Sequence, residues 1–153
     1  MSTLRMLLPA ALACTLLVAG CASTGPSVNP EALTGHTWTL VEATDADGRL
    51  DTALTGGERP PIELSFHSDR LGVRNACNGM GGDYQLKGDT LEIGNLMQTM
   101  MACEPALMAR EDAIKQRLQQ PLQLQFDEAG NRLTLRNGAG IMTFQPAAAQ
   151  PAP

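Results

Sequence analysis

Short runs in which apolar and polar residues alternate recur along most of this chain. The clearest run is residues 62–67 (IELSFH), in which every second side chain is apolar. Successive side chains of a β-strand point to opposite faces, so this run predicts a strand whose apolar side chains face the core and whose His67 faces outward. Other alternating runs lie at residues 37–42, 71–73, 84–86, 91–93, 96–100, 122–126, 133–135 and 141–144. The chain is therefore constrained to a fold built from many short strands.

One segment follows a different period. Between residues 105 and 120 apolar residues recur at helical spacing, Pro105 suits a first helical position, and Pro121 prevents continuation. Gly-Asp, Gly-Gly and Gly-Asn pairs mark turns between the alternating runs, and residues 43–61 form a polar connection. We therefore predict an α+β domain: a compact antiparallel β meander or partly closed barrel of about eight to nine short strands with one amphipathic α-helix.

The N-terminal residues predict export and lipidation. Arg5 supplies positive charge before an apolar stretch at residues 6–18, which is the architecture of a signal peptide. The stretch has about 13 residues, short of the roughly 20 that span a bilayer as a helix. Residues 17–21 (LVAGC) have the form of a bacterial lipobox, in which cleavage leaves Cys21 as the lipidated first residue. The alternative is an ordinary secretory signal, which needs only small residues near its cleavage site.

Lipidation of Cys21 would determine where the protein works. Two or more acyl chains, such as palmitate, hold a protein firmly on a membrane. In bacterial lipoproteins an aspartate after the cysteine favours the inner membrane, and here that residue is Ala22. We therefore predict a protein anchored in the outer membrane with its domain facing the periplasm. The predicted organisation is a signal peptide at residues 1–20, a lipidated cysteine and flexible tether at 21–30, a folded domain at 31–146 and a disordered tail at 147–153.

Cys77 and Cys103 are the two cysteines that remain in the folded part. Disulfides persist in an oxidising compartment such as the periplasm, so we predict a bond between them. The alternative is a reactive thiol, because Cys103 precedes the predicted helix and the dipole of a helix N-terminus favours a thiolate. The Cys-x-x-Cys arrangement common in redox enzymes is absent from the sequence, which favours the disulfide.

Two short patterns around these cysteines resemble the signatures of a known family. The first is Cys77-Asn78, followed after three residues by Gly-Asp-Tyr at 82–84. The second is Thr-Met-Met-Ala-Cys at residues 99–103, with Pro105 close behind. On these residues the chain is similar to the META domain family, in its HslJ-like (heat-shock protein HslJ type) bacterial lipoprotein form.

The resemblance covers about residues 33–145 and implies a small α+β domain on an envelope lipoprotein. It also implies a link to heat shock, stress response and drug tolerance, without an established reaction. Two positions depart from the family pattern, because Ala76 stands where glycine is usual and Glu104 separates Cys103 from Pro105. We expect these departures to alter the local backbone around the two cysteines, and they leave the resemblance to the family intact.

Composition and motifs argue against several other functions. The net charge of −5 argues against nucleic acid, whose binding depends on neutralising phosphates. Asp45, Asp47 and Asp51 match only part of a calcium loop, so we expect a solvated turn. The methionines before the predicted helix are spaced to face opposite sides of a strand, which disfavours a copper site. His36 and His67 are not spaced as a zinc pair, and we predict no metal and no cofactor.

The candidate binding residues are Asn75, Asn78 and Tyr84. The alternative for the two asparagines is that they satisfy local backbone groups in the turn that contains them. Glu111 and Asp112 form no paired acid and base, and we expect both on a solvated face of the helix. No residue is assigned to catalysis.

We therefore predict a non-enzymatic envelope protein, held to the membrane by a lipid on Cys21. It would contribute to stress or drug tolerance by binding an envelope protein or a small ligand near the outer membrane. One alternative is a carrier whose small barrel encloses an apolar ligand. A second alternative is a thiol-dependent enzyme that uses Cys103.

Overall fold

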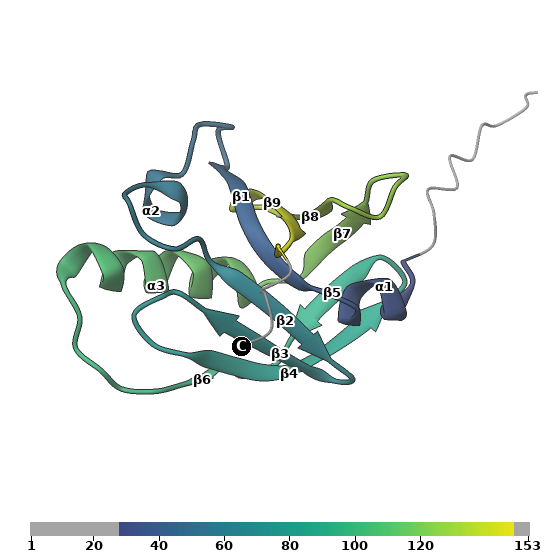
Figure 1. The fold of residues 1–153 in the computed structure, drawn as a ribbon, viewed down its shortest axis with the longest axis horizontal. Helices are drawn as coiled ribbons and strands as arrows, with labels where there is room; N and C mark the ends of the chain where they lie inside the picture. The colour runs from purple at the N-terminus through teal and green to yellow at the C-terminus, as the bar shows by residue number, and fades with distance from the viewer. Residues whose placement is uncertain (1–27, 149–153) are drawn as a thin grey trace, which may run out of the picture.

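The structure is a computed structural model that describes residues 28–148. Figure 1 shows its strands and helices along the chain. The strands are β1 (Thr37–Asp45), β2 (Glu63–His67), β3 (Arg70–Arg74), β4 (Met80–Lys87), β5 (Thr90–Ile93), β6 (Met97–Gln98), β7 (Leu122–Phe126), β8 (Leu133–Asn137) and β9 (Gly140–Pro146). The helices are α1 (Pro30–Thr34), α2 (Thr52–Thr55) and α3 (Pro105–Leu118).

The nine strands form one antiparallel sheet that closes on itself. β1 pairs with β2 on one side and with β9 on the other, and β3 pairs with both β2 and β4. Eight strands therefore form a closed barrel, while β6 pairs only with β4. The predicted α+β small barrel is confirmed, and it is closed rather than partly closed.

Side chains fill the interior of the barrel. Trp38 of β1, Phe66 of β2 and Phe144 of β9 are each no more than 1% exposed. Buried and exposed residues alternate strictly from Leu122 to Phe126 in β7, as the sequence pattern predicts. An eight-stranded barrel has an interior just wide enough for side chains. These aromatic and aliphatic groups therefore form the core.

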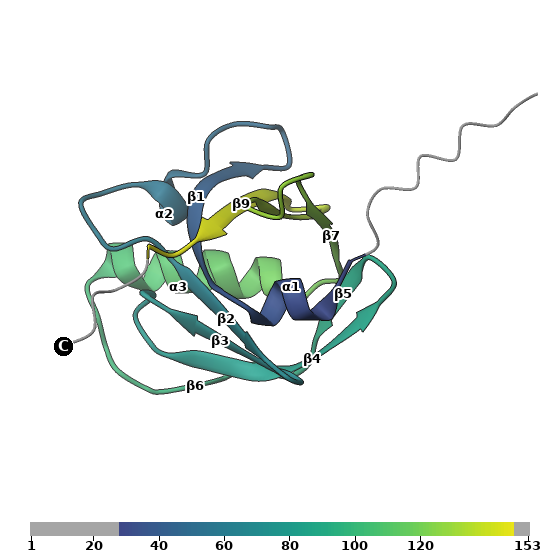
Figure 2. The same cartoon turned by 45° about the vertical axis from the view of Figure 1, so that its right-hand side comes forward.

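Helices lie at both ends of the barrel. In Figure 2 the strands encircle α1 in front and α3 behind. α1 buries Leu33 completely, and Nε1 of Trp38 donates a hydrogen bond to the Leu33 carbonyl oxygen at 2.9 Å. α3 buries Ile114 and Leu118 completely, and α2 packs against α3. The helices thus complete the core that the strands begin.

The folded part extends beyond the predicted limits at both ends. The predicted tether includes Val28, but this apolar residue packs against the core. The predicted tail includes Ala147, but its amide donates to the Thr37 carbonyl oxygen at 2.7 Å and so prolongs the pairing of β1 with β9. The predicted signal peptide, Cys21 and residues 149–153 lie outside the described part of the chain.

The sequence predicted neither short helix: α1 begins at Pro30, the last residue of the predicted tether, and α2 lies in the predicted polar connection. The side chains of Asn29 and Asp51 accept hydrogen bonds from the backbone of their first turns. Such short helices depend on caps and tertiary contacts, here the burial of Leu33 and Leu54, so no helical period marks them in the sequence. Within residues 28–148, no helix is both long enough and apolar enough to cross a membrane.

Candidate binding groove

The two cysteines of the folded part form a disulfide. Cys77 lies in the turn before β4, Cys103 lies just before α3, and their Cα atoms are 5.9 Å apart. The bond joins positions 26 residues apart in the sequence, and it is the predicted pairing. A thiol reaction at Cys103 would first require reduction of this bond.

Glu111 and Asn78 form a buried hydrogen-bond network beside the disulfide. Glu111 is 2% exposed, and its carboxylate accepts from the Asn78 amide at 2.5 Å and from Asn78 Nδ2 at 3.2 Å. It also accepts from Gln98 Nε2 at 3.1 Å. Asn78 Oδ1 accepts from the Thr99 hydroxyl at 2.9 Å and from the Met101 amide at 2.8 Å. The prediction that Glu111 is solvated is wrong, because this carboxylate holds the turn before β4 against the helix.

Arg110, the preceding residue of α3, joins α2 and two loop segments. It is 3% exposed, its Nη1 donates to the carbonyl oxygens of Pro60 at 2.9 Å and Asn75 at 3.2 Å, and its Nη2 donates to that of Leu54 at 3.1 Å. Burial, and then the positive charge of Arg59, lower the pKa of the Arg110 guanidinium. α3 thereby holds the segments that flank β2 and β3.

The predicted binding residues are all used by the fold. Asn75 has a φ of 65°, and its Nδ2 donates to the Pro61 carbonyl oxygen at 2.7 Å. The Tyr84 hydroxyl donates to the Ser68 carbonyl oxygen at 3.0 Å, and burial raises the pKa of Tyr84. The third residue, Asn78, belongs to the buried network with Glu111 and is 3% exposed. The structure brings none of them together on an open surface, and their role in binding stays a prediction.

The aspartates of the calcium-like segment also serve the fold. Asp45 Oδ1 accepts from the amides of Asp47 and Arg49, each at 2.9 Å, as in the predicted turn. Asp51 instead forms an ion pair with Arg117 of α3 at 2.7 Å. In the described residues, no group of three or more His, Cys, Asp or Glu side chains could hold a metal ion.

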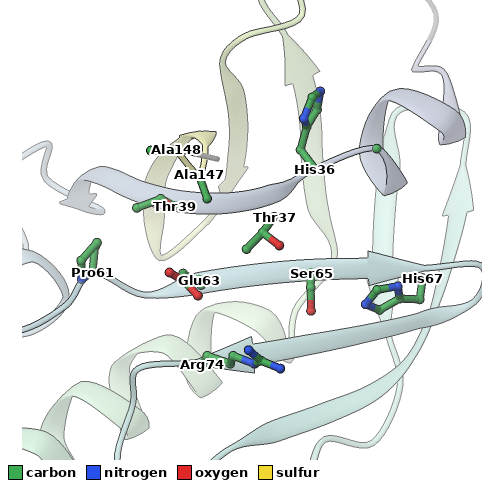
Figure 3. Close-up of a pocket in the computed structure, with 11 residues that line it drawn as sticks. His36, Thr37, Thr39, Pro61, Glu63, Ser65, His67, Arg74, Ala147 and Ala148 are labelled. Carbon is green, nitrogen blue, oxygen red and sulfur yellow. The ribbon is translucent and has the colours of Figure 1, made fainter. Parts of the chain in front are cut away.

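A groove of about 890 Å³ lies on the outer face of β1, β2 and β3, as Figure 3 shows. Outward-facing residues of these strands line it together with Gly35, His36, Pro61, Ala147 and Ala148. Cross-strand pairing sets the strand residues in rows: Thr37 lies opposite Ser65 in one row, and Thr39, Glu63 and Arg74 form the next. The residues between them, such as Trp38 and Leu64, point into the core and are fully buried. The alternation that builds the core therefore also builds the groove.

Both histidines of the chain line this groove. His67, at the end of β2, is exposed and faces outward, as predicted. The ring of His36 stands edge-on to that of Trp38, with centroids 5.5 Å apart. The only tryptophan of the chain therefore lies directly beneath the groove, in contact with one of its lining residues.

Arg74 and Glu63 lie opposite each other in the groove but do not pair. None of the five ion pairs within residues 28–148 includes either residue. In Figure 3 the Arg74 guanidinium points along β3 rather than toward the Glu63 carboxylate. By contrast, Arg70 and Asp83, which also face each other across a ladder, form an ion pair at 3.0 Å. Within residues 28–148, no ion pair thus uses either of these two opposite charges of the groove.

Sequence reasoning missed this groove. Alternation predicts which residues of a strand face outward, but it does not predict which strands lie side by side. One signal was available in Gly72, which leaves β3 without a side chain at an outward position between two buried residues. A Cβ at Gly72 would lie 2.8 Å from Ser65 Oγ, so glycine accommodates the hydroxyl of this groove residue.

Known proteins share both the sequence pattern and the fold. Residues 31–149 match the family model of the META domain. A search of curated proteins finds no match. The chain resembles an NMR structure at 28% identity and a TM-score of 0.59, over 78% of this chain and 96% of that one. An NMR structure of a protein from Burkholderia xenovorans shows the same fold at 22% identity and a TM-score of 0.62, over 93% of this chain and 100% of that one. The chain belongs to the META domain family.

Proposed function

We propose that the chain is a lipid-anchored envelope protein whose groove binds a ligand or partner close to the outer membrane. It contributes in this way to stress or drug tolerance, and it does so without catalysing a reaction. The observation that carries the proposal is the groove itself, a polar surface with both histidines and two unpaired opposite charges. Membership in the META domain family supports the association with the cell envelope.

The place of the groove in the chain favours a ligand near the membrane. α1 ends at Thr34, and the groove begins with the next two residues, Gly35 and His36. If Cys21 carries the lipid, only residues 22–27 lie between the anchor and Val28, which packs against the core. Six residues span at most about 20 Å even when fully extended. A groove joined to the anchor by so short a segment samples the membrane surface continually.

The structure gives less support to the two alternative functions. An apolar ligand inside the barrel would have to displace side chains such as Trp38, Phe66 and Phe144, which already fill the interior. A thiol-dependent enzyme would need a free Cys103, which is bonded to Cys77. The outer groove needs neither rearrangement nor reduction.

Complementation tests this function in a strain that lacks the gene and is challenged with heat or drugs. The wild-type chain is expected to restore tolerance, while Cys21→Ser and Arg74→Gln are expected not to, because one loses the anchor and the other loses a groove charge. The matched control is Arg136→Gln, which removes an exposed arginine of β8 outside the groove. Immunoblots establish that all variants accumulate to equal levels.

Full tolerance with both Cys21→Ser and Arg74→Gln would contradict the proposed function. The proposed function would likewise be contradicted if Arg136→Gln were the one variant of the three that lost tolerance, because that variant leaves the anchor and the groove intact.

A further inference from the structure

We propose that the groove binds a zwitterionic aminoalkyl phosphate, with the phosphate at Arg74 and the ammonium at Glu63. This inference rests on the proposed binding function and names the chemical class of the ligand. It follows from the charges that the groove leaves unpaired and from the hydrogen-bond donors that surround them.

The two charges are placed to receive a ligand that carries both signs. Glu63 and Arg74 are opposed across an antiparallel ladder, so their side chains leave neighbouring points of one surface. They nevertheless form no ion pair in the described structure, whereas Arg70 and Asp83, which are also opposed across a ladder, pair at 3.0 Å. A ligand with an anionic and a cationic group a short distance apart would satisfy both charges at once.

The donors around Arg74 favour phosphate over a carboxylate. A guanidinium binds phosphate oxygens bidentately. The hydroxyls of Ser65 and Thr37 and the imidazole of His67 line the same groove, and no side-chain hydrogen bond within residues 28–148 occupies them. Together these groups supply more donors than the two oxygens of a carboxylate can accept.

Two sources could supply this chemistry: a phospholipid head group and a free aminoalkyl phosphate. The full chain carrying Cys21→Ser distinguishes them, because it cannot reach a membrane through its own lipid. Calorimetry measures its binding to phosphoethanolamine, inorganic phosphate and ethanolamine. Trp38 fluorescence gives a second readout, since its ring contacts His36 of the groove. Sedimentation with vesicles compares phosphatidylethanolamine with phosphatidylcholine, whose quaternary ammonium has no N–H to donate.

Phosphoethanolamine is expected to bind more tightly than inorganic phosphate, and ethanolamine is expected to bind most weakly. Arg74→Gln should weaken binding of both phosphates by at least about tenfold, because it removes the charged donor. Glu63→Gln should abolish the preference for phosphoethanolamine and leave phosphate binding intact. The matched controls Arg136→Gln and Glu42→Gln remove exposed charges outside the groove and should change neither affinity.

Vesicle binding that depends on Arg74 and on phosphatidylethanolamine would identify the head group as the source. Binding of free phosphoethanolamine alone would identify a soluble ligand, and either result supports the inference. Absence of phosphoethanolamine binding, or unchanged binding by Arg74→Gln, would overturn it. If either of these results were obtained while Arg74→Gln still abolished tolerance in cells, the proposed ligand class would be wrong. The proposed binding function of the groove would stand.

Discussion

Replacement of both Cys77 and Cys103 by alanine is expected to lower the free energy of unfolding by about 3 to 4 kcal/mol. The disulfide closes a loop between positions 26 residues apart, so its removal increases the entropy of the unfolded chain. It also ties the turn before β4 to the start of α3, where Glu111 binds the same turn. For a domain whose total stability is of the order of 5 to 15 kcal/mol, this is a large fraction. Urea denaturation followed by circular dichroism measures the loss.

Reductant provides the control for this prediction. It should destabilise the wild-type protein by the same amount and leave the double alanine variant unchanged. A loss of less than about 1 kcal/mol, within the usual range for a single ordinary hydrogen bond, would contradict a major stabilising role for the disulfide.

Glu111→Ala is expected to destabilise the fold by about 3 to 5 kcal/mol, because it leaves buried donors without an acceptor. The carboxylate accepts two hydrogen bonds from Asn78, which is 3% exposed, and one from Gln98. Glu111→Gln keeps one acceptor oxygen and should lose about 1 to 2 kcal/mol.

Asp112→Ala is the matched control, because the neighbouring carboxylate is exposed on the same helix. Its effect should stay within about 0.5 kcal/mol, as is usual for surface substitutions. Chemical denaturation of the three variants under identical conditions provides the comparison. Equal effects of Glu111→Ala and Asp112→Ala would show that the buried network does not stabilise the domain.

The strands could be predicted because a half-buried strand leaves a period of two in its own sequence. Closure of the barrel could not, since it depends on β1 pairing with β9, which lies almost at the other end of the domain. The same pairing contains a register shift between Leu40 and Glu42, after which Glu42 is exposed and Ala43 is buried. A strict alternation continued from Trp38 and Leu40 would instead bury Glu42 and expose Ala43.

The interior of the helix was predicted from its apolar residues, and its buried charges were missed for a physical reason. Glu111 and Arg110 reach the backbone of loops that lie more than 30 residues away in sequence. Local spacing cannot distinguish such residues from a solvated charged face, because the loops that they bind are placed only by the complete barrel. The family pattern around Cys77-Asn78 marked the turn, but it did not identify the partner of that turn.

The groove illustrates the same limit for the candidate site. Its residues come from three strands and from segments next to α1, β2 and β9, and each strand residue is an ordinary outward-facing residue of its own run. Only the order of β1, β2 and β3 in the sheet brings His36, Ser65 and Arg74 to one surface. The sequence could therefore predict that these residues face outward, while their assembly into one groove required the fold.

Photo-crosslinking in intact cells tests the central claim most directly. A photoreactive amino acid is introduced at Thr37, which is exposed in the groove, or at Arg136, which is exposed on β8. Our account predicts an ultraviolet-dependent adduct at position 37 that mass analysis identifies as one compound or one protein. The adduct should be absent at position 136 and should decrease when Cys21→Ser removes the anchor. Equal crosslinking at both positions, with no dependence on Cys21, would contradict a membrane-tethered binding groove.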